Sequence, residues 1–469
     1  MDVSYFKGKK ITVLGLGLLG GGLGVVKFLA KHGAHVIVTD MKSKEQLAPS
    51  LAKLEGIKNI KYILGHHRQE DFLKVDMVII NPAVSWTNKY IKLAMEKKIP
   101  VEMDSSLFFQ LCKNPIIGIT GTKGKTTIST MVFDLLKLVG KNPIKVGIGN
   151  ASVLDKLEEL KKNSVVVFEL SSWRLSALGR IGKSPQIAVL KNILPDHLNY
   201  YKSMQEYVDD KKNIFANQKS KDWLIVNDDD EKVQEIIQDA KARIFSFSEK
   251  PIRKNYSVFL DGDNMYLNDG IDIKKLAVLD DIKIIGRHSI VNVMAAIGAV
   301  YAFGIKVPQI KEAILKLKGI PHRLEFVREL RGVRYYNDTA ATIPQAAISA
   351  INSFEGREVI LIAGGADKNL DFSELAKEIV EYSKGIIFLA GDATDKLILE
   401  IRKNLPEEDR NNKFIIVDSM DKAVEFASRS AQKDDIVLLS PGAASFGLFA
   451  NEFERGDRFR KAVNDLKDR

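Results

Sequence analysis

The sequence predicts an α/β protein of three domains, and three observations support this fold class. First, short apolar segments typical of buried parallel strands alternate with helical patterns along most of the chain. Second, this alternation restarts twice, so it forms three blocks. Third, a chain of 469 residues is longer than one hydrophobic core usually serves. We place the domains at residues 1–112, 113–319 and 320–469.

The first block predicts a Rossmann-like N-terminal domain. It opens with the strand Lys10–Leu14, passes through a glycine cluster and continues with a helical pattern from Val25 to Lys31. Two further strands are expected at His35–Thr39 and Met77–Ile80. A strand, a glycine turn and a helix in this order form the opening unit of a dinucleotide-binding sheet.

The second block predicts a central P-loop ATPase-type α/β domain, and the third predicts a Rossmann-like C-terminal domain. Strands of the second block are expected at Pro115–Ile119, Ser164–Phe168, Gln186–Leu190, Ile244–Ser248, Tyr256–Leu260 and Met265–Leu267. Strands of the third block are expected at Glu358–Ala363, Gly385–Ala390, Phe414–Val417 and Ile436–Leu439. Helical patterns between the last four indicate a parallel sheet with crossover helices.

Charge and composition exclude several classes of function. The formal net charge is +10, but Lys and Arg are scattered among Asp and Glu without a basic, aromatic-interleaved stripe, which argues against nucleic-acid binding. We expect no membrane insertion, because no apolar stretch reaches the length of a span and the first residues lack a secretory pattern. The single cysteine fits a reducing compartment. We therefore expect a cytoplasmic protein with anionic small-molecule partners.

A glycine-rich turn opens the second block and predicts a phosphate-binding loop. The segment GITGTKGKTT, residues 118–127, follows a strand and enters a helix expected near Ile128. Its N–H groups and the helix N-terminus suit a nucleotide phosphate. Lys125 has the reach for the β and γ phosphates, and Thr126 offers a hydroxyl to Mg²⁺. The spacing departs from the strict Walker A form, because Ile119 stands where that form has its first glycine.

A second glycine cluster, Gly15 to Gly20, matches the dinucleotide fingerprint, and Asp40 follows at the end of the next predicted strand, where an acid that binds a ribose would lie. An NAD site and a UDP site fit this pattern equally in chemical terms, and the presence of a second nucleotide loop favours UDP. Glycines that only pack a helix against a strand are the remaining interpretation.

Two polar residues after apolar strands are candidate metal ligands. Glu169 ends the predicted strand 164–168, at the sheet edge where the phosphate loop lies, and carboxylates are suitable Mg²⁺ ligands. His197 follows the next strand and has access to the same edge. Lys211 and Lys212 begin a predicted helix, and without further information they read as a solvated helix face.

These motifs together resemble the Mur ligase family. The ordered set is GITGTKGKTT (118–127), ELSSW (169–173), PDHL (195–198), YVDDKKNIFANQ (207–218), GRHSIVNVMAA (286–296), GIPHRLE (319–325), NDTAAT (337–342), GGADK (364–368) and SPGAASF with ERGDRF. The resemblance runs over nearly the whole chain, and the ELSS, PDH and SPGAAS elements favour the glutamate-adding branch. It implies an ATP-dependent ligase that joins D-glutamate to UDP-N-acetylmuramoyl-L-alanine through an acyl phosphate, in cytoplasmic peptidoglycan precursor synthesis.

The resemblance also assigns roles to individual residues. It implies ATP and two Mg²⁺ ions as cofactors, a carbamylated Lys211, and a monomer. The catalytic residues would be Lys125, Glu169, His197 and Lys211, and the metal ligands Thr126, Glu169, His197 and Lys211. The nucleotide would be bound by Gly121, Thr122, Lys123, Gly124, Lys125, Thr126, Thr127, Asn292, Arg323 and Asp338. The UDP-linked substrate would meet Leu18, Leu19, Asp40, Asn150 and Ser171, while Thr342, Lys368, Ser445 and Phe446 would serve the incoming glutamate.

Several positions differ from the family pattern, and rival functions follow from particular motifs. Ala340 stands where many members have Lys, Lys123 replaces an Asn, and Trp173 with Arg174 replaces Phe-Gln.

A sibling ligase that adds L-glutamate, including the folylpolyglutamate type, is the alternative within the enzyme class. An NAD-dependent dehydrogenase would use the first glycine cluster, and a regulatory nucleotide-binding protein would use the second.

Overall fold

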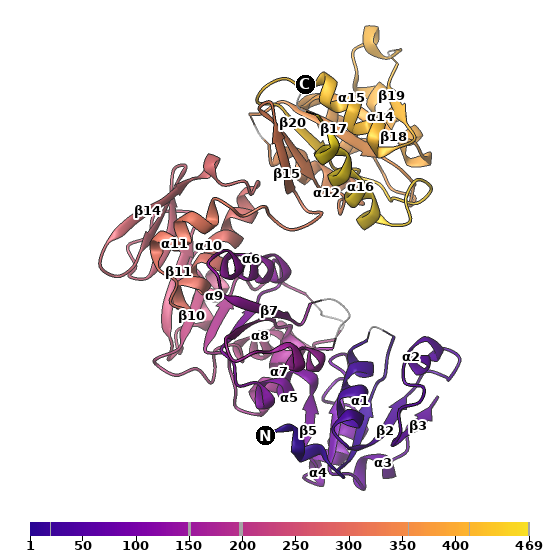
Figure 1. Cartoon of the computed structure of the whole chain (residues 1–469), viewed down its shortest axis with the longest axis vertical. Coiled ribbons are helices and arrows are strands. Elements are labelled where there is room, and N and C mark those ends of the chain that lie inside the picture. The colour runs from indigo at the N-terminus through magenta and orange to yellow at the C-terminus, as the bar shows by residue number, and fades with distance from the viewer. Residues whose placement is uncertain (19, 149–151, 197–199, 355, 412, 468–469) are drawn as a thin grey trace. The chain divides into compact units, whose positions relative to one another are not determined.

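The computed structural model describes residues 1–469 apart from 19, 149–151, 197–199, 355, 412 and 468–469. The described chain forms two compact units (Figure 1). The first contains residues 1–277 and 292–313, and the second contains residues 278–291 and 314–469. Three sheets, of five, nine and six strands, organise these units.

A five-stranded parallel sheet in the order β3-β2-β1-β4-β5 opens the first unit. Its strands are β1 (Lys10–Leu14), β2 (His35–Asp40), β3 (Ile60–Leu64), β4 (Met77–Ile80) and β5 (Val101–Met103). Its helices are η1 (Val3–Phe6), α1 (Gly21–Lys31), α2 (Ala48–Ala52), α3 (Glu70–Leu73), α4 (Lys89–Glu96) and α5 (Asp104–Leu111). The chain crosses from one side of β1 to the other between β3 and β4, which creates a crevice at the strand ends.

Both faces of this sheet are buried because successive strand residues point to opposite sides. Ile79 packs in a core that also contains Val26 and Leu29 of α1. Its neighbour Ile80 packs in a separate core with Phe72 of α3 and Ile91 of α4. The continuous apolar strands noted in the sequence are therefore explained by helices on both faces.

The nine-stranded sheet has the order β14-β13-β12-β11-β10-β9-β6-β8-β7. Its strands are β6 (Ile116–Thr120), β7 (Asn142–Val146), β8 (Ser164–Glu169), β9 (Ile187–Leu190), β10 (Trp223–Asn227), β11 (Arg243–Ser248), β12 (Ser257–Asp261), β13 (Asn264–Asn268) and β14 (Ile273–Val278). Its helices are α6 (Lys125–Leu138), η2 (Leu154–Glu159), α7 (Ser172–Arg180), α8 (Met204–Lys212), α9 (Glu231–Ile236), η3 (Leu279–Asp281), α10 (Arg287–Ala302) and α11 (Val307–Ile314). β6 lies between β8 and β9, all parallel, so the segments that follow these three strands meet at one sheet edge.

The six-stranded sheet of the second unit has the order β15-β16-β20-β17-β18-β19, with β15 antiparallel to β16. Its strands are β15 (Glu325–Leu330), β16 (Val333–Asn337), β17 (Val359–Gly364), β18 (Ser383–Leu389), β19 (Ile415–Val417) and β20 (Ile436–Leu439). Its helices are α12 (Pro344–Asn352), α13 (Ser373–Tyr382), α14 (Asp392–Asn404), η4 (Glu407–Asp409), α15 (Met420–Ser430) and α16 (Glu452–Asp465). Successive side chains of β20 again point to opposite faces of the sheet and so belong to two cores. Leu438 packs with Leu375 of α13, and Leu439 packs with Phe459 of α16.

The strands expected from the sequence are present within two residues of their expected bounds, and two helix boundaries are corrected. α6 begins at Lys125 rather than near Ile128, because the left-handed Gly124 is its N-cap and the helix starts directly after it. Lys211 and Lys212 end α8 and do not begin a helix, since Ser203 caps that helix at its other end. Among the described residues, no helix combines the length and the apolar character that a bilayer crossing needs.

Candidate active site

The phosphate loop joins β6 to α6 and is held in shape by one side chain. The Oδ1 atom of Asn192, just after β9, accepts hydrogen bonds from the N–H groups of Thr122 and Lys123 at 2.8 and 3.0 Å. The N–H groups in the first turn of α6 have no acceptor within the helix, and they carry its positive dipole end. The loop is therefore formed in advance, with the helix N-terminus left for an anion.

Two lysines converge on this loop. The Nζ atom of Lys125 donates to the carbonyl oxygens of Gly121 and Thr122, each at 2.9 Å. The Nζ atom of Lys211, from the last turn of α8, donates to the same Gly121 oxygen at 3.1 Å. Burial lowers the pKa of Lys125, against the opposing influence of Glu169. The loop thus holds two amino groups where a polyanion would lie.

Lys211 is almost completely enclosed. Its side chain is 1% exposed, and its Nζ lies 4.7 Å from the ring centre of Tyr207. Burial, with a further contribution from the nearby charge of Lys125, lowers the pKa of Lys211 to about 7. Lys212 is only half-buried. The expected helix face is therefore wrong for Lys211, which faces the phosphate loop as a partly neutral amine.

Thr126 and Glu169 form the second feature of the site. The Thr126 hydroxyl donates to the Oε2 atom of Glu169 at 2.8 Å, so the start of α6 and the end of β8 meet there. Burial raises the pKa of the Glu169 carboxyl. A hydroxyl and a carboxylate beside a phosphate loop are hard oxygen ligands of the kind that Mg²⁺ takes. Within the described ranges, no three His, Cys, Asp or Glu side chains gather as a metal site.

Asn292 of α10 provides an unfilled hydrogen-bonding position next to the loop. Its side chain is 3% exposed, yet its Oδ1 atom has no hydrogen-bond partner among the residues that the structure describes. That oxygen lies 2.9 Å from the point where a Cβ at Gly124 would be. Buried acceptors are normally satisfied, so an orphan beside a nucleotide loop fits an amino group such as that of adenine.

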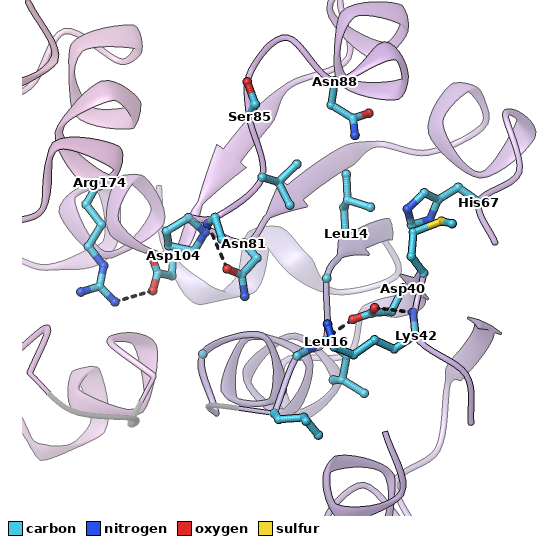
Figure 2. Close-up of a pocket in the computed structure, with 18 of the residues that line it drawn as sticks. Leu14, Leu16, Asp40, Lys42, His67, Asn81, Ser85, Asn88, Asp104 and Arg174 are labelled. Atoms are coloured by element: carbon cyan, nitrogen blue, oxygen red, sulfur yellow. Dashed lines mark hydrogen bonds and ion pairs between the residues drawn. The ribbon is translucent and has the colours of Figure 1, made fainter. Parts of the chain in front are cut away.

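A cavity of about 880 Å³ lies in the crevice of the five-stranded sheet. Figure 2 shows Asp40 beside the glycine loop, where its carboxylate accepts from the Gly17 N–H at 3.1 Å and from the Lys42 N–H at 2.9 Å. Leu18 also lines the cavity and is 51% exposed. The cavity has the position of a nucleotide site at a topological switch point.

The same cavity is bounded on another side by a residue of α7. Arg174 pairs with Asp104 at 3.1 Å (Figure 2). It also donates to the Gly147 carbonyl oxygen at 3.1 Å. Ser171, the N-cap of α7, accepts from the Arg174 N–H at 3.3 Å. The crevice of the first sheet and the start of α7 therefore share one cavity wall.

The second unit places Arg323 and Asp338 on neighbouring segments. His322 and Leu324 have positive φ angles of 68° and 42°, so the exposed Arg323 lies in a strained turn. The Leu324 N–H donates to Oδ1 of Asp338 at 3.1 Å, and the Ser440 hydroxyl donates to Oδ2 at 2.8 Å. Burial raises the pKa of Asp338 to about 7.

Three loops at the carboxyl ends of β16, β20 and β17 carry the residues expected to serve glutamate. Ala366 and Ala444 exchange two backbone hydrogen bonds, and the Gly442 N–H donates to the Ala341 carbonyl oxygen at 2.9 Å. Ser445 is buried, whereas Lys368 is exposed with its Nζ 5.8 Å from the ring centre of Phe446. Thr342 follows on the loop after β16 and is half-buried.

Arg455 joins these loops and was missed as a functional candidate. It is fully buried, and it donates to Thr339 Oγ1 at 3.0 Å, the Thr339 carbonyl oxygen at 3.0 Å and the Ala443 carbonyl oxygen at 3.1 Å. Burial lowers its pKa to about 10. Its only sequence signal is the ERGDRF motif, which does not reveal what the guanidinium contacts.

The structure brings Lys125, Thr126, Glu169, Lys211 and Asn292 to one edge of the nine-stranded sheet. The second unit holds Arg323 and Asp338 together, and separately gathers the loops with Thr342, Lys368, Ser445 and Phe446. Leu19, Asn150 and His197 lie outside the described residues.

Three family models match the chain. They are the Mur ligase MurD-like N-terminal domain over residues 9–102, the Mur ligase middle domain over 119–300, and the Mur ligase glutamate ligase domain over 322–442. The predicted three-domain α/β architecture is confirmed, while the predicted boundaries stay predictions. The first model covers the glycine cluster for which an NAD site had been the alternative.

Curated relatives are similar over nearly the full length. A UDP-N-acetylmuramoylalanine–D-glutamate ligase of Roseiflexus sp. (strain RS-1) is 39% identical over 98% of this chain and 99% of its own. The protein of the same name from Borreliella afzelii (strain PKo) is 37% identical over 99% of this chain and 100% of its own.

Solved structures show the same fold at lower identity. A UDP-N-acetylmuramoyl-L-alanyl-D-glutamate–2,6-diaminopimelate ligase matches with a TM-score of 0.60 and 18% identity, covering 99% of this chain and 94% of that chain. The UDP-N-acetylmuramate-alanine ligase of Thermotoga maritima matches with a TM-score of 0.51 and 19% identity, covering 98% of this chain and 100% of that chain.

Proposed function

The chain belongs to the Mur ligase family, and from this premise we propose that it joins D-glutamate to UDP-N-acetylmuramoyl-L-alanine at the expense of ATP, as a step of peptidoglycan precursor synthesis. Its curated relatives named UDP-N-acetylmuramoylalanine–D-glutamate ligase are 39% and 37% identical over nearly the whole chain. The third family model, described as a glutamate ligase domain, supports the same amino acid.

The single observation that carries the proposed chemistry is the meeting of Lys125 and Lys211 at Gly121, beside the Thr126–Glu169 pair. A carboxylate is a poor electrophile, and a triphosphate repels it. The γ-phosphoryl group must therefore reach a carboxylate oxygen in a site where positive charge offsets that repulsion. We infer that the substrate carboxylate is phosphorylated here, and that the glutamate amine then displaces phosphate from the acyl phosphate.

The residues around the loop divide this task. Lys125 has to leave the Gly121 and Thr122 carbonyl oxygens to meet the terminal phosphates, and the N–H groups at the start of α6 bind their oxygens. Thr126 and Glu169 supply oxygen ligands for Mg²⁺, which would neutralise phosphate charge when bound. His197, for which the family resemblance implies a second metal position, stays a prediction.

Lys211 suits the proposed carbamylation. A lysine with a pKa of about 7 is neutral in about half of the molecules at pH 7, whereas an ordinary lysine is almost fully charged. The neutral amine attacks CO₂, a new N–C bond forms, and one proton is released. The product is an anion with two oxygen donors where an ammonium had been, next to the position proposed for Mg²⁺. Burial favours Lys211 over Lys212 for this role.

The remaining substrate groups are assigned to one cavity and to one set of loops. We assign the cavity with Asp40 and Leu18 to the UDP group, with Ser171 closer to the sugar. A role for Asn150, which lies outside the described residues, stays a prediction. We assign the loops with Thr342, Lys368, Ser445 and Phe446 to D-glutamate, where a lysine suits its side-chain carboxylate. A cytoplasmic location and a monomeric state stay predictions.

The test is phosphate release with UDP-N-acetylmuramoyl-L-alanine and ATP, measured with D-glutamate and L-glutamate in parallel. We expect release with D-glutamate only. Release with L-glutamate but not D-glutamate would instead place the chain with a sibling ligase. Release without either amino acid would remove the proposed ligation.

A further inference from the structure

Lys191 is a lysine that none of the roles above uses, although the fold places it on the phosphate loop. It follows β9 directly, and β9 pairs with β6, so the chain after β9 runs beside the chain after β6. The Lys191 N–H donates to the Thr120 carbonyl oxygen at 3.2 Å, which extends the ladder to the start of the loop. The Lys191 backbone is thereby fixed against the loop.

The Lys191 side chain runs along the loop from Gly121 to Gly124. Its Cβ lies 3.2 Å from the point where a Cβ at Gly121 would be, and its Nζ lies 2.7 Å from the corresponding point at Gly124. Gly124 has a φ of 91° and caps α6. A side chain at Gly124 would therefore be strained and would also displace the Lys191 amino group.

The Lys191 amino group also lies close to the orphan oxygen of Asn292. That Oδ1 atom is 2.9 Å from the same point at Gly124 that lies 2.7 Å from the Lys191 Nζ. Lys191 is half-buried, and burial lowers its pKa against the opposing influence of Glu249. Within the described part of the chain, no hydrogen bond or ion pair engages its ammonium group. Glu249 acts on this ammonium group through its charge but does not outweigh the desolvation, so a bound anion would offset a remaining cost in free energy.

We propose that Lys191 binds the α-phosphate of ATP, an assignment that rests on the proposed nucleotide site and adds a contact to it. The α-phosphate is the group that links adenosine to the β-phosphate. The Lys191 amino group lies beside Gly124, the N-cap of α6, and near Asn292. The orphan oxygen of Asn292 suits adenine, while Lys125 and the helix N–H groups suit the β and γ phosphates. A lysine at this point contributes a charge-assisted hydrogen bond to the phosphate nearest the nucleoside.

The experiment measures the affinity of ATP, ADP, AMP and adenosine by calorimetry or competition, for wild type and Lys191→Met. We expect each of the three nucleotides to bind about tenfold more weakly to Lys191→Met, and adenosine to bind as it does to wild type. Lys191→Arg, which keeps the charge, should recover most of the loss. Lys125→Met should behave differently and weaken ATP and ADP but leave AMP unchanged.

Lys183→Met is the matched control for the loss of one positive charge, because Lys183 is exposed and lies before β9 rather than after it. It should bind all four ligands like wild type. The proposal is overturned if Lys191→Met binds AMP normally, or if adenosine is weakened as much as AMP, since the latter would indicate a purely structural effect. If wild type itself bound no ATP, the proposed function would fail first, which distinguishes the two outcomes.

Discussion

Lys125 and Lys211 donate hydrogen bonds to one acceptor, the carbonyl oxygen of Gly121, at 2.9 and 3.1 Å. Two ammonium groups this close disfavour each other in a poorly solvated site, and the charge of Lys125 adds to burial in lowering the pKa of Lys211. The pair is therefore under electrostatic tension that a polyanion, or a change of charge on Lys211, would relieve. The main functional predictions follow from this relationship.

Lys125→Met should reduce phosphate release by at least about a hundredfold, because a positioned cation is lost from the developing phosphoryl charge. The variant should fold normally, since methionine keeps most of the apolar stem. The measurement is D-glutamate-dependent phosphate release, with Lys183→Met as the control. Unchanged turnover would remove the phosphate loop from the chemistry.

Lys211 should form a carbamate that is observable by ¹³C NMR in ¹³C-bicarbonate. The signal should grow as the pH rises through about 7, because the neutral amine becomes the major form above its pKa. Lys211→Met should lose the signal and Lys212→Met should keep it. A signal that survives in Lys211→Met, or that disappears in Lys212→Met, would contradict the assignment.

Glu169→Gln should raise the Mg²⁺ concentration needed for half-maximal phosphate release and lower the maximal rate. The amide oxygen still accepts from the Thr126 hydroxyl, so the local geometry is kept while the metal-binding charge is lost. The thermal unfolding midpoint should not fall, because burial already disfavours the ionised carboxylate. An unaltered Mg²⁺ dependence would exclude Glu169 as a ligand.

Asp338→Asn should stabilise the second unit at neutral and alkaline pH. The pKa of Asp338 is about 7 in the folded protein against 3.8 as its ordinary value, so the folded state holds the proton more tightly than the unfolded state. The free energy of unfolding of the wild type therefore falls as the pH rises from about 4 to 7, because Asp338 ionises more readily in the unfolded state. The uncharged variant avoids this fall.

The gain for Asp338→Asn should be about 4 kcal/mol at pH 8, because the pKa is raised from 3.8 to about 7, and near zero at pH 4. Urea unfolding at both pH values measures it. A variant less stable than wild type at pH 8 would show that the carboxylate is favoured by contacts outweighing its burial.

The sequence could predict the site residues that lie at the ends of clearly apolar strands. The direction of the strands and their order in the sheet bring these residues to one edge. Glu169 was expected at a strand end and lies there, as the last residue of β8. The antiparallel strand β15 was not expected, because its sequence, Glu325-Phe-Val-Arg-Glu-Leu330, has charged residues within it. Composition alone did not separate such an edge strand from a loop.

The burial of charged residues was the feature that the sequence predicted least well. Lys211 reads as a solvated helix residue, and only the packing of α8 against the phosphate loop shows that it is enclosed. Lys191 and Arg455 carry no motif signal for their contacts either, since these depend on chain segments far away in the sequence. A single sequence shows the periodicity of its apolar residues, but it does not show which distant side chains come into contact.

The transfer of oxygen from the substrate carboxylate to phosphate tests the central claim most directly. UDP-N-acetylmuramoyl-L-alanine labelled with ¹⁸O in both carboxylate oxygens is incubated with ATP and D-glutamate, and the released phosphate is analysed by mass spectrometry. We predict one ¹⁸O atom in each phosphate and one in the amide product, because the acyl phosphate passes a carboxylate oxygen to phosphorus. Unlabelled phosphate, or label in AMP, would contradict the account.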